Sequence, residues 1–160
     1  MAETTLPLPR TPDPMEAPPV RWGILAPGGI AHSFARALRT GTRQEIAAVG
    51  SRSLARAAAF ADEFGADTAY GSYDELVADP SVDIVYVASP HSGHREHAQL
   101  ALGAGKPVLV EKAFARSAAE ARAVLDLART LTGGNESSLN LISIGQALVD
   151  EVSRIAAALR

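Results

Sequence analysis

The sequence predicts an α/β protein with a doubly wound parallel sheet, and three observations support this. Short β-rich runs alternate with alanine-rich helical segments, as expected for successive β-α-β units. The run at residues 84–88 has no polar side, which indicates a strand covered on both faces of its sheet. A glycine-rich turn, Gly28-Gly29, separates the first strand from the first helix, where such sheets bind their ligands.

The elements follow one another from residue 20. Apolar and β-branched runs predict strands at residues 20–25, 45–50, 68–70, 82–88 and 108–110. Helical composition and periodicity predict helices at residues 30–38, 53–64, 72–77, 94–104 and 117–131. Three serines are placed as N-caps, and the last two have a glutamate three residues on: Ser53, Ser72 and Ser117.

Composition narrows the class of protein. A chain of 160 residues with 47% hydrophobic residues is long and apolar enough to fold as one globular domain. The net charge of −3 gives no support to nucleic-acid binding. Cysteine is absent, so disulfides, thiolate metal sites and thiol nucleophiles are excluded. Because neither a secretory signal nor a membrane-spanning run is recognisable, we expect a cytoplasmic protein without membrane partners.

The two ends of the chain differ from its centre. Residues 1–19 hold six of the ten prolines, so we expect a disordered, proline-rich leader without helix or strand. The domain then spans residues 20–131. Residues 132–160 divide into a polar linker, a strand within residues 139–144 and an amphipathic segment from residue 146. That segment has three interpretations, namely packing on the core, self-association, or a foreign sequence from a frameshift or fusion.

The turn after the first strand predicts a phosphate site. Ala26-Pro27-Gly28-Gly29-Ile30-Ala31 fits the pattern G-x-G-x-x-A, with Ala26 in place of the first glycine. Gly28 allows a pyrophosphate to approach the backbone, and the following helix directs amide donors and its positive end at the anion. Because Pro27 favours extended backbone at the preceding residue, Ala26 is expected to replace glycine without strain. The alternative is a glycine-rich turn that only connects two elements.

The end of the second strand suggests which dinucleotide is bound. NAD sites usually carry an acidic residue there, which binds the ribose 2′-hydroxyl. This chain instead has Gly50-Ser51-Arg52-Ser53, without a carboxylate. The guanidinium of Arg52 and the hydroxyl of Ser51 suit a 2′-phosphate, so NADP is predicted over NAD. In the alternative interpretation Arg52 is a solvated loop residue and Ser51 only initiates the helix.

Residues 21–131 resemble a known family, the N-terminal NAD(P)-binding Rossmann domain of the Gfo/Idh/MocA oxidoreductases. The first landmark is the strand and turn at residues 21–31. The second, Ser89-Pro90-His91-Ser92-Gly93-His94, is similar to the family's Thr-Pro-Asn-x-x-His segment. The third, at residues 105–112, is similar to Gly-Lys-x-Val-x-x-Glu-Lys-Pro. The Trp-Gly-Ile-Leu-Ala start and the Val-Gly-Ser-Arg strand end look most like the dihydrodiol dehydrogenase branch.

The resemblance implies a set of cofactor-binding residues, with the glycine turn at the pyrophosphate and the Ser-Arg pair at the 2′-phosphate. Residues 89–91 would pass beside the ribose and nicotinamide, and the glutamate would orient the cofactor end of the site. The set comprises Ala26, Gly28, Gly29, Ile30, Ser51, Arg52, Ser89, Pro90, His91 and Glu111.

The resemblance also implies that Lys112 is catalytic, placing substrate beside the nicotinamide and assisting proton transfer. Two departures weaken the match. Ala113 stands where the family has proline, so we expect Lys112 to be less rigidly placed. Nothing after residue 131 resembles the family's second, α+β domain, which forms the substrate pocket and supplies a histidine as general acid or base.

The functional hypotheses follow from these features. In a complete member of the family, hydride would pass between NADP and a hydroxyl-bearing carbon of a sugar, diol or polyol, and we expect poor turnover from this chain alone. The alternatives are a non-catalytic nucleotide-binding or interaction module, and a truncated gene product. The partners considered are the cofactor, a sugar or diol substrate, and either further copies of this chain in a homo-oligomer or a separate partner chain. His91, His94 and His97 are spaced by three, but no carboxylate completes a set, so no metal site is predicted.

Overall fold

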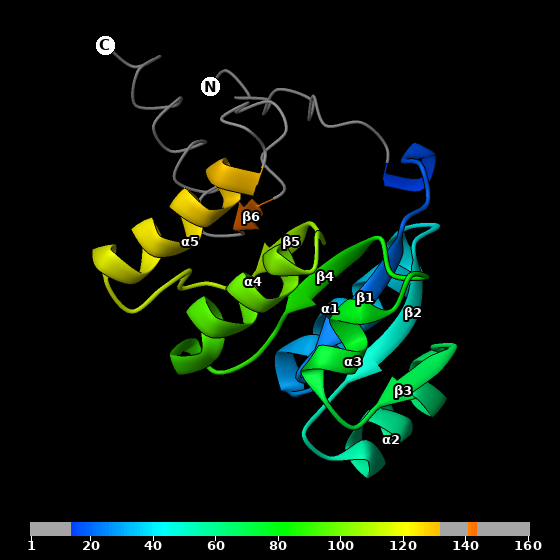
Figure 1. Cartoon of the computed structure of the whole chain (residues 1–160). Coiled ribbons are helices and arrows are strands. Elements are labelled where there is room, and N and C mark those ends of the chain that lie inside the picture. Colours follow the sequence, from blue (N-terminus) through cyan, green and yellow to red (C-terminus); the bar gives the residue numbers. More distant parts are fainter. Residues whose placement is uncertain (1–13, 132–140, 144–160) are drawn as a thin grey trace, which may run out of the picture.

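A six-stranded, fully parallel sheet forms the centre of the protein in the computed structural model, which describes residues 14–131 and 141–143 (Figure 1). The strands lie in the order β3-β2-β1-β4-β5-β6, which is that of a doubly wound dinucleotide-binding sheet. Their bounds are β1 Arg21–Leu25, β2 Glu45–Gly50, β3 Thr68–Tyr70, β4 Ile84–Val87, β5 Val108–Val110 and β6 Leu141–Ser143. The predicted fold class is confirmed.

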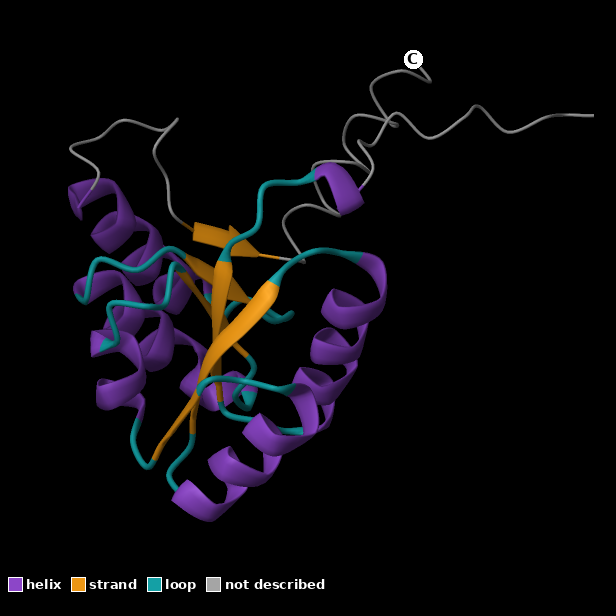
Figure 2. Cartoon of the chain, turned by 90° about the vertical axis from the view of Figure 1, so that its right-hand side faces the viewer, coloured by secondary structure: helices purple, strands orange, loops and turns teal. Residues whose placement is uncertain are grey.

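Helices cover both faces of the sheet (Figure 2). They are α1 Gly29–Gly41, α2 Leu54–Phe64, α3 Tyr73–Ala78, α4 His94–Gly103 and α5 Ala118–Leu131. Successive strand residues face opposite cores because side chains alternate across a sheet. Ile24 of β1 belongs to the core under α1 and α2, whereas Leu25 belongs to the core under α3, α4 and α5. Both side chains have no solvent exposure, which explains the almost continuously apolar strands.

The predicted helix starts are in place. The Ser72 hydroxyl accepts a hydrogen bond from Glu75 N (3.2 Å) and donates one to the Glu75 carboxylate (2.8 Å). The Ser117 hydroxyl accepts from Glu120 N at 3.2 Å. Ser53 occupies the N-cap position of α2 as expected, but its side chain makes no capping hydrogen bond. Two of the three helices therefore begin where a side chain satisfies a free backbone amide.

The chain ends differ in part from expectation. Pro14–Glu16 forms one 3₁₀ turn (η1) where no helix was expected, since proline at the first position of a turn needs no amide hydrogen. Gln44 then binds the backbone of two residues, accepting from Val20 N (2.9 Å) and donating to Pro18 O (3.0 Å). The predicted strand near residues 139–144 is confirmed as β6. Residues 1–13, the linker at 132–138 and the amphipathic segment from residue 146 lie outside the described residues.

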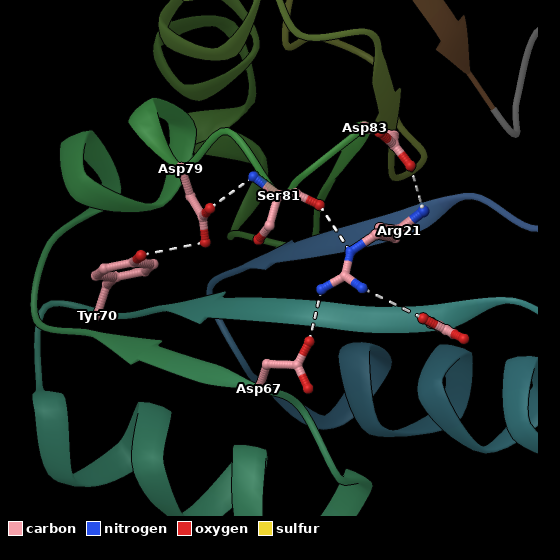
Figure 3. A network of polar contacts seen from close by, with 7 residues as sticks. Arg21, Asp67, Tyr70, Asp79, Ser81 and Asp83 are labelled. Atoms are coloured by element: carbon pink, nitrogen blue, oxygen red, sulfur yellow. Dashed lines mark hydrogen bonds and ion pairs between the residues drawn. The ribbon is translucent and has the colours of Figure 1, made fainter.

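The N-terminal ends of the strands are joined by a polar network (Figure 3). The Arg21 guanidinium donates to the Asp67 carboxylate (2.6 Å) and to Ser81 O (3.0 Å), and its backbone amide donates to the Asp83 carboxylate (2.8 Å). These contacts tie β1 to the segments that lead into β3 and β4. They lie at the edge opposite to the strand C-termini, so the two edges of the sheet have separate roles.

Candidate functional site

A cleft of about 680 Å³ opens at the C-terminal ends of β1, β2 and β4. It lies at the switch point of the sheet, where the chain leaves β1 toward α1 on one face and leaves β4 toward α4 on the other. Its walls are formed by the loops that follow these strands and by the first turns of α1, α2 and α3. The lining residues are Ala26, Pro27, Gly28, Gly29, Ile30, Ser51, Arg52, Ser53, Arg56, Tyr73, Ala88, Ser89 and Pro90.

Ala26 turns the chain from β1 into the cleft with a positive φ of +68°. Its amide still donates to Gly50 O (3.0 Å) of the neighbouring strand, while its carbonyl accepts from Gly28 N (2.8 Å). The expectation that Pro27 would hold Ala26 in extended backbone is therefore wrong. Tertiary closure of the turn against β2 outweighs the local preference, and Ala26 adopts the left-handed conformation that glycine adopts more easily.

The N-terminus of α1 has the features of a phosphate site. A Cβ at Gly28 or Gly29 would meet no atom within 4 Å, so open space borders the backbone at both positions. His32 N donates the first helical hydrogen bond to Gly28 O (3.1 Å), and His32 Nδ1 lies 2.8 Å from the same oxygen. The amides of residues 29–31 precede that bond and are available to an anion. The residues present therefore fit a dinucleotide pyrophosphate.

Two arginines stand at the end of β2. Arg52 is exposed and lines the cleft as predicted, and Arg56, in the first turn of α2, lines it as well. No ion pair in the described part of the chain involves either guanidinium, so both charges can serve an anion. Ser51 is buried and its hydroxyl accepts from Ser53 N at 3.2 Å. Arg56 was missed, although its place one turn after Arg52 gave a signal.

The β4 side of the cleft contains a serine held by a histidine. Ser89 is 5% exposed, and its Oγ lies 2.8 Å from Nδ1 of His97 on α4. The His97 ring packs edge-on against Tyr73, with ring centroids 4.7 Å apart. Burial is the main cause that lowers the pKa of His97. Sequence reasoning gave Tyr73 and His97 no role here, because α3 and α4 bring them together from distant segments.

Lys112 and His91 lie outside the cleft lining. His91 precedes α4, and Lys112 is in the loop that follows β5. His91 Nε2 is 2.9 Å from Lys112 O, and His94 Nδ1 is 2.8 Å from Ala113 O. The buried His94 ring also reaches Ser89 O with Nε2 at 2.8 Å, so it joins this loop to the cleft wall. The Lys112–Ala113 peptide is cis. Two imidazoles thus hold the main chain at Lys112, despite the missing proline.

Glu111 is buried behind the cleft rather than in its lining. Its carboxylate accepts hydrogen bonds from the Tyr86 hydroxyl (2.7 Å) and from Lys112 N (3.1 Å). Burial and then the contact with Glu111 raise the pKa of Tyr86, so the phenol stays protonated and donates. This arrangement fixes the start of the Lys112 loop. The implied role of Glu111 at the cofactor remains a prediction.

Among the described residues there is neither a cluster of metal ligands nor a membrane-spanning helix. Within residues 14–131 and 141–143, no three His, Asp or Glu side chains are grouped to hold a metal ion. His91, His94 and His97 each face protein oxygen atoms instead. No helix in the same part of the chain has the length and apolar character needed to cross a membrane.

Comparison with known proteins identifies the domain. Residues 20–133 match the Gfo/Idh/MocA family model, an oxidoreductase family with an NAD-binding Rossmann fold. The chain is 50% identical over 123 residues to D-xylose 1-dehydrogenase (NADP(+)) of Hypocrea jecorina, covering 69% of this chain and 31% of that protein. It is 42% identical over 113 residues to trans-1,2-dihydrobenzene-1,2-diol dehydrogenase of Mus musculus, covering 69% and 34%.

Solved structures agree. A 3-ketoreductase from Actinomadura kijaniata in complex with TDP-benzene and NADP has a TM-score of 0.67 at 33% identity, covering 71% of this chain and 36% of that one. The chain spans about a third of the length of the curated relatives it matches. The predicted resemblance, including the likeness to dihydrodiol dehydrogenases, is confirmed. The chain therefore belongs to the Gfo/Idh/MocA oxidoreductase family and contains its NAD-binding Rossmann domain.

Proposed function

We propose that this chain binds NADP(H) as the cofactor domain of a sugar or diol oxidoreductase. The observation that carries the proposal is the end of β2, where Arg52 and Arg56 line the cleft beside Ser51. A 2′-phosphate would gain two guanidinium donors there, whereas a carboxylate that would favour NAD is missing from the lining. The NADP(+) dependence in the printed name of the Hypocrea jecorina relative supports the same choice.

The remaining residues would divide the cofactor between them. The first-turn amides after Gly28 and Gly29 would bind the pyrophosphate, and Ser89 and Pro90 would face the nicotinamide half. The bound nicotinamide supplies or accepts the hydride. Lys112 would place its ammonium beside the oxygen of the reacting carbon, where negative charge develops. The substrate would be a sugar or diol. The proposed compartment is the cytoplasm, because the chain has no cysteines to form the disulfides that are typical of small secreted domains.

Thermal unfolding with NADPH, NADH or neither tests the proposal. A ligand present at about 100 times its dissociation constant adds about 2.7 kcal/mol to the free energy of unfolding. For a chain of this size the melting temperature then rises by several degrees. We expect the larger rise with NADPH. A larger rise with NADH would refute the 2′-phosphate assignment, and no rise with either from a cooperatively unfolding chain would leave the glycine turn as a connector only.

Substitution of Arg52 and Arg56 tests whether these residues cause the preference for NADPH over NADH. Arg52→Gln and Arg56→Gln should each weaken NADPH binding by about tenfold, as expected for loss of a charge-assisted hydrogen bond, and leave NADH binding nearly unchanged. Arg122→Gln, at an exposed arginine of α5 far from the cleft lining, is the matched control. Equal losses for the two cofactors would show that the arginines act on the shared part of the dinucleotide.

A further inference from the structure

Ser89 is a cleft residue whose hydroxyl is hydrogen-bonded to another side chain. It follows β4 and lines the cleft with 5% of its surface exposed. Its Oγ lies 2.8 Å from His97 Nδ1. His97 comes from the second turn of α4 and is not part of the lining, so it stands behind the serine. His97 would therefore act on a ligand through the lining residues that it contacts, and Ser89 is the one to which it is hydrogen-bonded.

The His97 ring is fixed by its neighbours. Tyr73, which lines the cleft, contacts it edge-on at a centroid distance of 4.7 Å. On its other side, a Cβ at position 93 would lie 2.6 Å from His97 Cε1 and 2.8 Å from Nδ1. Gly93 has a φ of −98°, which any residue adopts, so the space taken by the ring explains the need for glycine.

The charge state of the ring also matters. Burial lowers the pKa of His97, Arg52 and His94 act in the same direction, and Glu96 opposes them. The imidazole is then uncharged at neutral pH, with one nitrogen that accepts and one that donates. A serine hydroxyl otherwise rotates freely. With His97 Nδ1 as its partner, the Ser89 hydroxyl keeps one orientation, and its remaining hydrogen-bonding capacity can serve a ligand in the cleft that Ser89 lines.

We propose that His97 is a positioning residue for the cofactor, acting by fixing the Ser89 hydroxyl toward the nicotinamide half of NADP(H). The inference rests on the proposed function. The pyrophosphate site follows β1 and the 2′-phosphate site follows β2, so the other half of the dinucleotide extends across the switch point toward β4 and Ser89. A preorganised hydroxyl binds a ribose more tightly because less rotational freedom is lost on binding.

Variants of His97 test the contact. His97→Leu removes the hydrogen-bonding atom, whereas His97→Asn retains a polar atom where Nδ1 lies. We expect His97→Leu to weaken NADPH binding by about fivefold, the worth of one neutral hydrogen bond, measured by titration of NADPH fluorescence on the whole chain. His97→Asn should stay within about twofold of the wild type. Rescue by asparagine separates positioning from a loss of packing.

A double-mutant cycle shows whether the effect passes through Ser89. In a Ser89→Ala background, His97→Leu should cause no further loss of affinity, because the group it positions is gone. Gly93→Ala disturbs the same contact without replacing either partner, because its Cβ would lie 2.6 Å from His97 Cε1 and 3.3 Å from Ser89 Oγ. Its methyl group would displace the His97 ring, so it should reproduce the fivefold loss in the wild type and none with Ser89→Ala.

The outcomes separate this inference from the function on which it rests. A wild-type chain that binds neither NADPH nor NADH would refute the proposed function and the inference together. A wild-type chain that binds NADPH with unchanged affinity in His97→Leu would refute the inference alone. An equal loss from His97→Leu with and without Ser89 would also overturn it, since His97 would then act by another route.

Discussion

Ala26 is a cleft residue with a strained backbone conformation. A left-handed backbone costs an L-residue about 1–2 kcal/mol, and glycine avoids most of that cost. Ala26 has a φ of +68°. We therefore expect Ala26→Gly to raise the free energy of unfolding by about 0.5–1 kcal/mol, after the extra entropy of glycine in the unfolded chain is subtracted. Chemical denaturation of the two proteins measures the difference.

The control makes the same chemical change in ordinary helical backbone. Ala59 is exposed in the middle of α2, and Ala59→Gly should lower the free energy of unfolding by about 1 kcal/mol. If Ala26→Gly raises the free energy of unfolding and Ala59→Gly lowers it, the backbone at Ala26 is strained. A loss of stability in Ala26→Gly would show that the turn favours alanine for a reason other than backbone conformation.

At the scale of residues, the sequence predicted those parts of the site that lie together along the chain. The glycine turn and Ser51-Arg52, which line the cleft, were identified as candidate phosphate-binding residues from residue type and spacing alone. His97 was not found as a partner of Ser89, because that contact depends on how α4 packs and on the room that Gly93 leaves. The conformation of Ala26 was missed because a local rule for residues before proline was overruled by one hydrogen bond to Gly50 of β2 and one within the turn, from Gly28.

At the scale of elements, α3 packs directly against the end of β2, where Gly50 has no side chain to keep the helix away. A Cβ at Gly50 would lie 2.8 Å from Leu76 Cβ and 3.2 Å from Ser72 O, so neither α3 nor its N-cap could stay in place. We expect Gly50→Ala to lower the free energy of unfolding by about 1–3 kcal/mol, the usual cost of overpacking. Urea denaturation followed by circular dichroism measures the loss.

Gly41 provides the matched control for Gly50. It is the last residue of α1, and a Cβ there would meet no atom within 4 Å. Gly41→Ala should therefore leave stability unchanged or raise it by up to about 1 kcal/mol, because alanine has the better helix propensity. If both alanine variants behaved alike, close approach of α3 would not be the reason for glycine at position 50.

The pattern of apolar residues predicted the helices and strands well. The sheet is covered on both faces, so its strands are continuously apolar, whereas each helix is covered on one face and has apolar residues at helical spacing. Strand bounds at residues 45–50, 68–70 and 108–110 agree with the structure. The 3₁₀ turn at Pro14–Glu16 was not predicted, since proline content argues against regular helix but permits one short turn. Nor could periodicity show that Glu111 lies behind the cleft, bound to Tyr86.

For the whole molecule, the two edges of the sheet differ in some of their charged side chains. Arg52 and Arg56 border the cleft at the C-terminal edge. Around Arg21 at the N-terminal edge stand Asp67 and Asp83 (Figure 3). The proposed anion site thus lies at the other edge from Asp67 and Asp83, whose carboxylates would repel a bound anion. Separation of the two edges lets one end of the sheet hold the fold together while the other remains open to a ligand.

Asp79 connects several elements and makes the stability of the whole domain depend on pH. It accepts from the Tyr70 hydroxyl (3.1 Å) and Ser81 N (2.8 Å), and its backbone carbonyl accepts from Lys106 Nζ (2.8 Å). Burial acts to raise the pKa of Asp79, but the hydrogen bonds from Ser81 and Tyr70 and the charge of Lys106 together hold it below its usual value. β3, α3 and the loops before β4 and β5 meet at this carboxylate.

The sign of the pH effect follows from that lowered pKa. The folded state binds the Asp79 proton less readily than the unfolded state, so the stabilisation is complete above the usual carboxyl pKa near 4 and is lost as pH falls through the lower folded value.

Asp79→Asn should be less stable than the wild type by about 1.5 kcal/mol at pH 7, with the gap closing below about pH 4. Asp62→Asn, on the exposed side of α2, should show no such gap at any pH. Denaturation midpoints between about pH 2 and 7 measure both, and a gap that stays constant with pH would mean that Asp79 stabilises the fold through shape and not through charge.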